Sequence, residues 1–346
     1  MVDNERVKKR VPVYAALALL LATAIGLVIL VKNSFFTMVI AVLVMLLGVA
    51  VLAGLALIVG KHMKRGGLAV QIGIIVVAAI ACLAVLVAQI AQVELYYPNS
   101  DEVSSAELAA DPAMEHVSVD GAYSGWFVHN ADGRAPLVLF FGGNGNCASR
   151  LVSSFETTGF WQMEAGQPST SVRTNYMMID YPGYGQSSGR PSQNSIFAMA
   201  LAAYDYAASR PDVDPARIIV EGYSLGTGPA TYLASGRNVA GLVLFAPYDT
   251  GVSLYNSQFD IFHGPMTLLV TQRFDSASYA EHVAVSPLII TSTSDATIDH
   301  TLSEALATHF PQPADLHVLS SLGHEDYFDS TEVRALVGAY VEEALS

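Results

Sequence analysis

A strand that turns directly into a helix is the feature that most constrains how this chain folds. Residues 217–235 read RIIVEGYSLGTGPATYLAS, which is an apolar run, a tight turn and then a helical stretch. Ser224 lies at the centre of a G-x-S-x-G pattern, residues 222–226. The flanking glycines remove side chains that would clash in so sharp a turn, and the turn lifts the serine hydroxyl above the sheet. We therefore predict that Ser224 is a nucleophile and not an ordinary turn residue.

Apolar strand-like runs alternate with helical stretches along the rest of the C-terminal part. Such runs include APLVLFF, TNYMMIDY, GLVLFAP and PLIITSTS, preceded by the pair HVSVDG and YSGWFVHN. Fully apolar strands separated by helices indicate a mostly parallel sheet covered on both faces, and the preceding pair is predicted to be antiparallel. The predicted fold class is therefore α/β, with eight strands and helices on both faces of the sheet.

Three long apolar runs precede this part, at residues 11–31, 35–60 and 68–93. Each is longer than the roughly 18 uncharged residues that a helix needs to cross a hydrocarbon core. We therefore predict three transmembrane helices within residues 1–95. The first is predicted to stay uncleaved, because its apolar residues continue well past the ATA of a possible signal-peptide site.

Charge is distributed very unevenly between the two parts. Basic residues precede the first apolar run and lie between the second and third, which predicts a cytoplasmic N-terminus and an extracytoplasmic C-terminal part. Residues 94–346 hold 9 Lys and Arg against 29 Asp and Glu. A surface this acidic repels phosphate backbones, so nucleic acid is excluded as a partner.

A nucleophilic serine needs a base, and the base needs an acid that orients it. Two strand ends downstream of Ser224 supply candidates: Asp295 follows PLIITSTS, and His324 follows LHVLSSLG. The carboxyl ends of strands in an open α/β sheet meet at the edge where ligands bind. We predict a triad of Ser224, His324 and Asp295. Asp249, which follows GLVLFAPY, is the alternative acid.

Two backbone N–H groups are predicted to hold an oxyanion during acyl transfer. One belongs to Leu225, which follows the serine, and the other to Asn144 in the loop GGNGNCASR. The loop lacks the lysine of a phosphate-binding loop, which disfavours a nucleotide. Cys147 has no adjacent histidine and is predicted to be a small packing residue. Motifs for metal binding are missing from the sequence, so we predict neither a metal nor another cofactor.

From about Val117 to the C-terminus, the chain resembles the α/β-hydrolase superfamily. It is most similar to a small-lid subgroup that includes bud-emergence-type membrane hydrolases and protein depalmitoylases. The segments that carry the resemblance are FFGGNGN, IDYPGYGQSSGRPS, VEGYSLG, GLVLFAPYDT, PMTLLVTQRFDS, PLIITSTSD and GHEDYF. The resemblance implies an α/β-hydrolase fold with a minimal lid, and it implies nucleophile, base and acid roles for the three triad residues. Two positions depart from the subgroup: Gly142 replaces a usual histidine, and Ser292 a usual glycine.

Together these features predict a membrane-anchored serine hydrolase that cleaves carboxylic esters or thioesters through an acyl-enzyme. The predicted domains are a transmembrane region at 1–95, a linker at 96–115 and a hydrolase domain at 116–346. The predicted partners are an acyl ester, thioester or lipid-like substrate and the lipid bilayer, and the predicted location is the cell membrane, with several spans. Two alternatives stay open: a serine peptidase with the same triad, and a non-catalytic binding module with a hydrolase fold.

Overall fold

The computed structural model of the protein describes residues 96–346, apart from 162–171 and 261, together with Gly73, Val76, Val77 and Ile80. The chain divides after Leu95 into two units, and the second, Tyr96–Ser346, contains the candidate site. Every strand that the structure describes belongs to this second unit.

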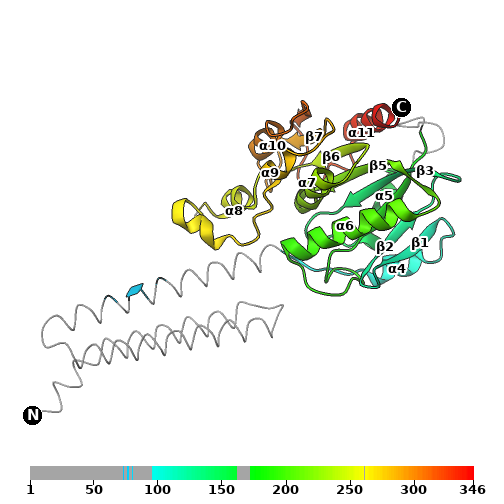
Figure 1. The fold of residues 1–346 in the computed structure, drawn as a ribbon, viewed down its shortest axis with the longest axis horizontal. Helices are drawn as coiled ribbons and strands as arrows, with labels where there is room; N and C mark the ends of the chain where they lie inside the picture. Colours follow the sequence, from blue (N-terminus) through cyan, green and yellow to red (C-terminus); the bar gives the residue numbers. More distant parts are fainter. Residues whose placement is uncertain (1–72, 74–75, 78–79, 81–95, 162–171, 261) are drawn as a thin grey trace, which may run out of the picture. The chain divides into compact units, whose positions relative to one another are not determined.

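One eight-stranded sheet forms the centre of the second unit (Figure 1). Its order is β1-β2-β4-β3-β5-β6-β7-β8; β1–β2 and β2–β4 are antiparallel pairs and all the others are parallel. The predicted eight-stranded, mostly parallel α/β sheet is thereby confirmed. The strands are β1 (Met114–Val119), β2 (Tyr123–Val128), β3 (Ala135–Phe141), β4 (Asn175–Ile179), β5 (Val213–Tyr223), β6 (Gly241–Phe245), β7 (Leu288–Ser292) and β8 (Asp315–Leu319).

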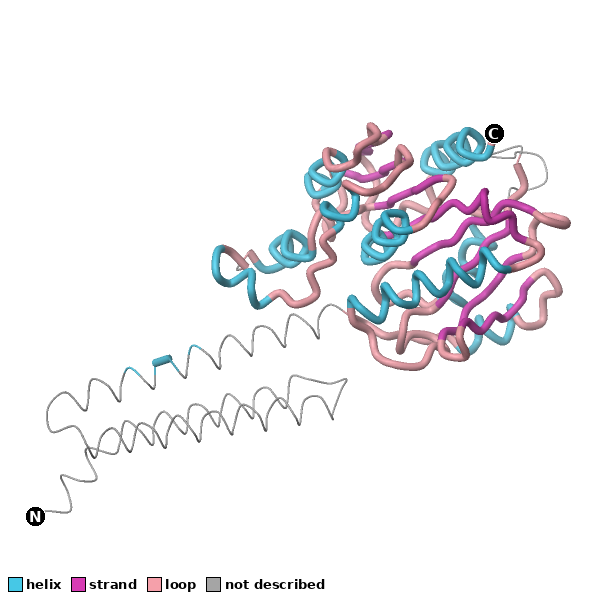
Figure 2. The backbone as a smooth tube through the Cα atoms, in the orientation of Figure 1, coloured by secondary structure: helices cyan, strands magenta, loops and turns pink. Residues whose placement is uncertain are grey.

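Helices cover both faces of the sheet (Figure 2). Successive residues of a strand point to opposite faces, so β5 shows which helices lie where. A Cβ atom added at Gly222 would lie 2.8 Å from the Cβ of Ala230, so that face of β5 meets α7. Ile219 and Tyr223, on the other face, share an apolar cluster with residues of α5 and α11. The helices are α4 (Glu102–Leu108), α5 (Ala148–Thr158), α6 (Gln193–Ser209), η1 (Ser224–Gly226), α7 (Thr227–Gly236), α8 (Gly251–Phe259), η2 (Gly264–Leu269), α9 (Ser276–Ala280), α10 (His300–Ala307) and α11 (Thr331–Leu345).

The composition of the strands explains which of them are buried. Every residue of β3 and of β6 is buried, as expected for strands that are covered on both faces. Edge strand β8 instead contains no fully buried residue. Between β6 and β7 the described residues form only the short helices α8, η2 and α9. The predicted linker, residues 96–115, contains α4 and the start of β1, and the predicted domain boundary at 116 stays a prediction.

The structure corrects the prediction of a transmembrane region. Among the described residues, no helix combines the length and the apolarity that crossing a bilayer requires. The predicted spans 11–31, 35–60 and 68–93 lie outside the described residues, except at the four helical positions between Gly73 and Ile80. The prediction rested on the length and lack of charge of the apolar runs, and such runs do not show what surrounds a helix. The finding contradicts the predicted transmembrane fold, the bilayer partner and the multi-pass location with an extracytoplasmic hydrolase domain.

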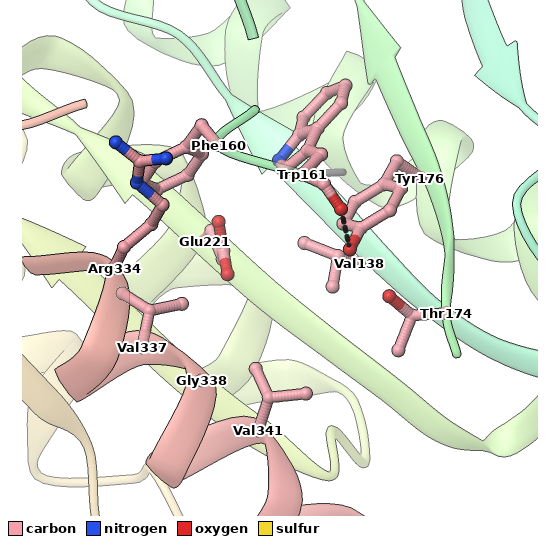
Figure 3. A pocket seen from close by; sticks show the side chains of 10 residues that line it. All are labelled: Val138, Phe160, Trp161, Thr174, Tyr176, Glu221, Arg334, Val337, Gly338 and Val341. Atoms are coloured by element: carbon pink, nitrogen blue, oxygen red, sulfur yellow. Dashed lines mark hydrogen bonds between the residues drawn. The ribbon is translucent and has the colours of Figure 1, made fainter. Parts of the chain in front are cut away.

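One carboxyl group interrupts the apolar interior of the sheet. Glu221 of β5 is 1 % exposed, and its Oε2 atom has no hydrogen-bond partner among the described residues. Figure 3 shows its carboxyl group between Arg334 and Trp161. Burial raises the pKa of Glu221 to about 8, because burial penalises the charged form.

Replacement of Glu221 by glutamine is therefore expected to change how stability depends on pH. The folded state holds the Glu221 proton more tightly than the unfolded state, whose pKa is near the ordinary 4.5. The wild type thus loses stability as pH rises from about 4.5 to about 8, and the loss levels off above that pH. The total is on the order of a few kcal/mol, at 1.36 kcal/mol per pKa unit.

Urea unfolding at a series of pH values measures this effect. The variant Glu221→Gln should gain stability relative to the wild type across that window, whereas the exposed control Glu107→Gln should follow the wild type. Parallel curves for wild type and Glu221→Gln would show that the carboxyl group titrates normally.

Candidate active site

Ser224 lies at the sharp turn between strand β5 and the helices that follow it. Its backbone φ is +52°, in the left-handed region that non-glycine residues rarely adopt. A Cβ atom added at Gly222 would lie 2.6 Å from the carbonyl oxygen of Gly226, and one at Gly226 would lie 2.1 Å from that of Phe141. Because Gly222 has no side chain, the backbone of the turn can approach it closely. Gly226 allows the turn to pack against the end of β3.

The hydroxyl of Ser224 is the first member of a three-residue hydrogen-bonded chain. Nε2 of His324 lies 3.0 Å from Oγ of Ser224, and Nδ1 of His324 lies 2.8 Å from Oδ2 of Asp295. Asp295 follows β7 and His324 follows β8, each within a few residues of the strand end. The structure thus brings together the three residues that the sequence analysis selected, at the carboxyl edge of the sheet.

Asp295 is held as an ionised acceptor. Its Oδ1 accepts hydrogen bonds from the backbone N–H groups of Thr297, at 2.8 Å, and Ile298, at 2.9 Å. Its Oδ2 accepts a further bond from the hydroxyl of Tyr327 at 3.1 Å. Burial acts to raise the pKa of Asp295, but the hydrogen bonds from His324 and the backbone outweigh it and hold the pKa below its ordinary value. The carboxylate is therefore charged at neutral pH, as an acid that orients histidine must be.

The alternative acid, Asp249, does not contact the histidine. One of its carboxylate oxygens accepts the N–H of the next residue, Thr250, at 2.7 Å, and its backbone carbonyl accepts the N–H of Ala277 at 2.8 Å. Its carboxylate forms no hydrogen bond or ion pair with His324, whose Nδ1 bonds Asp295. The geometry therefore favours Asp295.

The loop after β3 contains the other predicted residue, Asn144. Among the described residues, its backbone N–H has no hydrogen-bond acceptor. Its side-chain oxygen accepts two hydrogen bonds, from the N–H of Tyr97 at 2.9 Å and from the hydroxyl of Tyr184 at 2.9 Å. Leu225 is the second residue of η1, and N–H groups in a first helical turn have no partner within the helix. Both N–H groups are thus free to donate to an anionic ligand.

The loop that follows β4 holds the Asn144 loop in place, which the sequence analysis did not foresee. The hydroxyl of Tyr181 donates to the carbonyl of Gly142 at 2.6 Å, and a carboxylate oxygen of Asp180 accepts the N–H of Ala148 at 2.6 Å. Burial raises the pKa of Asp180, against the effect of its hydrogen bonds from backbone N–H groups. Asp180 and Tyr181 belong to the segment IDYPGYGQSSGRPS. That this segment carries part of the family resemblance was the only feature of the sequence that drew attention to them.

Two further side chains fix the positions of the histidine and the acid. The hydroxyl of Tyr223 donates to the backbone carbonyl of His324 at 2.7 Å. The hydroxyl oxygen of Ser292 accepts the N–H groups of Ser294 and Leu322, each at 3.2 Å. Ser292 thereby ties the loop of Asp295 to the loop of His324. The serine at this unusual position therefore has a local structural role.

Two other features bear on the predicted chemistry. Cys147 is buried and precedes α5, and its sulfur lies 3.6 Å from the hydroxyl of Ser149. Within the described residues, no cluster of three or more His, Cys, Asp or Glu side chains is arranged to hold a metal ion. The arrangement at Ser224 is suited to nucleophilic attack with proton transfer through an imidazole.

Comparisons with known proteins relate the chain to two sequence relatives and one solved structure. An uncharacterized protein of Mycobacterium tuberculosis is 32% identical over 237 residues, which cover 67% of this chain and 79% of that protein. The alpha/beta hydrolase domain-containing protein 17C of Xenopus laevis is 28% identical over 65% of this chain and 68% of its own length. The structure of an esterase from Pyrococcus furiosus superposes with a TM-score of 0.54 at 15% identity, over 72% of this chain and 99% of that one. No protein-family model matches the chain.

Proposed function

Because the chain belongs to the α/β-hydrolase superfamily and is a hydrolase, we propose that it is a serine hydrolase that cleaves carboxylic esters or thioesters through an acyl-enzyme. The observation that carries the proposal is the continuous hydrogen-bonded chain from Ser224 through His324 to Asp295. Such a chain makes a neutral serine hydroxyl nucleophilic at the moment of attack.

In the first half of the proposed reaction, Ser224 Oγ attacks the carbonyl carbon of the substrate. Nε2 of His324 takes the hydroxyl proton, and Asp295 stabilises the imidazolium that forms. The N–H groups of Asn144 and Leu225 hold the negative oxygen of the tetrahedral intermediate. When that intermediate collapses, the bond to the leaving group breaks, and His324 gives its proton to the departing alkoxide or thiolate.

The second half repeats these proton transfers with water. His324 takes a proton from a water molecule as the water oxygen attacks the acyl carbon. The bond between the acyl carbon and Oγ of Ser224 then breaks, and His324 gives the proton to Oγ. The products are a carboxylic acid and the free enzyme. Each proton taken by His324 is given back within the same half-reaction, so no outside acid or base is needed.

A substrate panel with the purified full-length chain tests the proposed reaction class. Carboxylic esters and thioesters with short and long acyl chains should be hydrolysed, with a rapid initial release of the leaving group where deacylation is slow. Aminoacyl anilides should react far more slowly. Faster cleavage of the anilides, or turnover of none of these compounds by the wild type, would contradict the proposal.

Replacement of Tyr181 by phenylalanine tests whether the loop after β4 positions the oxyanion donors. The variant loses only the hydroxyl that holds the carbonyl of Gly142. We expect kcat to fall about tenfold with little change in KM, because the loop N–H groups bind the transition state more than the substrate. The control Tyr204→Phe removes a comparable bond, to the carbonyl of Asn238, and should leave kcat unchanged. Equal losses in both variants, or a change in KM alone, would rule out the positioning role.

A further inference from the structure

A small cavity lies between the sheet and helix α11, on the face of β5 that Glu221 shares with Tyr223 (Figure 3). Its volume is about 20 Å³. One water molecule needs roughly 10–15 Å³ of such space, so the cavity has room for one or two water molecules. Val138, Val337 and Val341 form part of its wall. Polar groups of three other segments complete it.

Three buried polar atoms on this wall have no hydrogen-bond partner among the described residues. They are Oε2 of Glu221, Nε of Arg334 and Nε1 of Trp161. Glu221 and Arg334 are therefore not joined directly through these atoms. The Arg334 guanidinium donates through Nη1 to the carbonyl of Thr158 at 3.0 Å. Folded proteins pair nearly all their buried polar atoms, with protein groups or with ordered water, so three such atoms around one cavity need a common partner.

The chemistry of these atoms restricts what the partner can be. Arg334 Nε and Trp161 Nε1 carry hydrogens and need an acceptor, whereas Glu221 Oε2 in its ionised form needs a donor. A metal cation would face two N–H donors, and a halide would face an acceptor oxygen whenever Glu221 is ionised or carries its proton on Oε1. Water accepts from both nitrogens and still donates to the carboxyl oxygen. The remaining titratable group on the wall, the hydroxyl of Tyr176, already donates to the carbonyl of Trp161 at 2.7 Å.

We propose that this cavity is an internal water site, in which an ordered water molecule bridges Glu221, Arg334 and Trp161. The bridge joins strand β5, three residues before Ser224, to helix α11 and to the segment that follows α5. It also donates to Oε2 of Glu221 both when the carboxyl group is ionised and when its proton lies on Oε1. The site is independent of the proposed catalytic function.

A crystal structure at a resolution that shows ordered water tests the proposal directly. We expect a density peak of water height within about 3 Å of the three atoms, the usual hydrogen-bond distance. Crystals soaked in bromide and in rubidium salts should show no anomalous peak in the cavity. An empty cavity, or an anomalous peak from either ion, would overturn the proposal.

A cavity-filling variant gives a second test in solution. The expected change in Tm has one sign if the cavity holds water and the opposite sign if it does not. Val341→Ile adds one methylene group to the wall. If water is bound, the added group displaces it and leaves three polar atoms unpaired, so the Tm falls. If the cavity is dry, filling it raises the Tm. The control Val318→Ile changes a valine that is 40% exposed on β8 and should leave the Tm unchanged. A higher Tm for Val341→Ile would contradict the proposed water site.

Discussion

Replacement of Ser224 by alanine is expected to lower kcat for ester substrates by a factor on the order of 10⁶, the size of effect seen when a triad nucleophile is removed. The variant lacks the only atom that the proposed mechanism bonds to the substrate. His324 and Asp295 keep their mutual hydrogen bond of 2.8 Å, so the fold of the site should persist. Residual hydrolysis should come only from the oxyanion donors and from binding.

Steady-state kinetics and thermal unfolding on the same samples measure this result. The matched control is Ser235→Ala, which removes a serine hydroxyl from the end of the helix that follows the turn, where it bonds the carbonyl of Tyr232. The control should keep its activity, and both variants should unfold near the wild-type temperature. An alanine variant at position 224 with most of the wild-type rate would exclude this serine as the nucleophile.

Replacement of Asp295 by asparagine is expected to lower kcat by about 10⁴-fold, as the corresponding change does in a serine protease with a Ser-His-Asp triad. The amide oxygen can still accept the backbone N–H groups of Thr297 and Ile298, which lie 2.8 and 2.9 Å from Oδ1. The amide NH₂ then faces Nδ1 of His324, so the imidazole must take the tautomer that cannot accept the serine proton. The loss is thus a loss of histidine orientation and charge, with little change in packing.

The variant Asp249→Asn supplies the comparison that separates the two candidate acids. In the wild type, the half-buried Asp249 carboxylate bonds the N–H of Thr250 and not His324, so kcat of the variant should stay within about threefold of the wild type. The measurement is kcat for both variants against one ester. A large loss at Asp249 together with a small loss at Asp295 would reverse the assignment.

The sheet could be predicted from the sequence because strands that are buried on both faces are apolar at every position. The runs that became β3 and β6 contain only apolar residues and glycine, and the structure buries every one of them. The residues of the candidate site were predicted on related grounds. A strand that ends in a polar loop places Asp295 and His324 at one edge of a parallel sheet, wherever the strands lie in the chain.

The contacts that hold the site could not be predicted in the same way. Tyr181 and Gly142 are 39 positions apart, and their hydrogen bond exists only because β4 lies beside β3 in the sheet. No local pattern records which hydroxyl meets which carbonyl across such a distance. The surroundings of the buried Glu221 could not be predicted either. An acidic residue within an apolar run indicates neither the cavity beside it nor the unpaired polar atoms of its neighbours.

The transmembrane prediction, which rested on the length and lack of charge of three apolar runs, was wrong. Apolar length is necessary for a membrane span, and all three runs have it. It does not determine which environment the segment occupies. The strands and the candidate site instead rested on several features that agreed, namely periodicity, turn chemistry and the order of residues along the chain.

Mapping a covalent adduct shows directly whether Ser224 is the nucleophile. The full-length chain is treated with a fluorophosphonate, which reacts with activated serine hydroxyls, and is then digested and analysed by mass spectrometry. We predict one adduct, on the peptide that contains Ser224, and its loss in Ser224→Ala. An adduct at another residue such as Cys147, or equal labelling of wild type and Ser224→Ala, would contradict it.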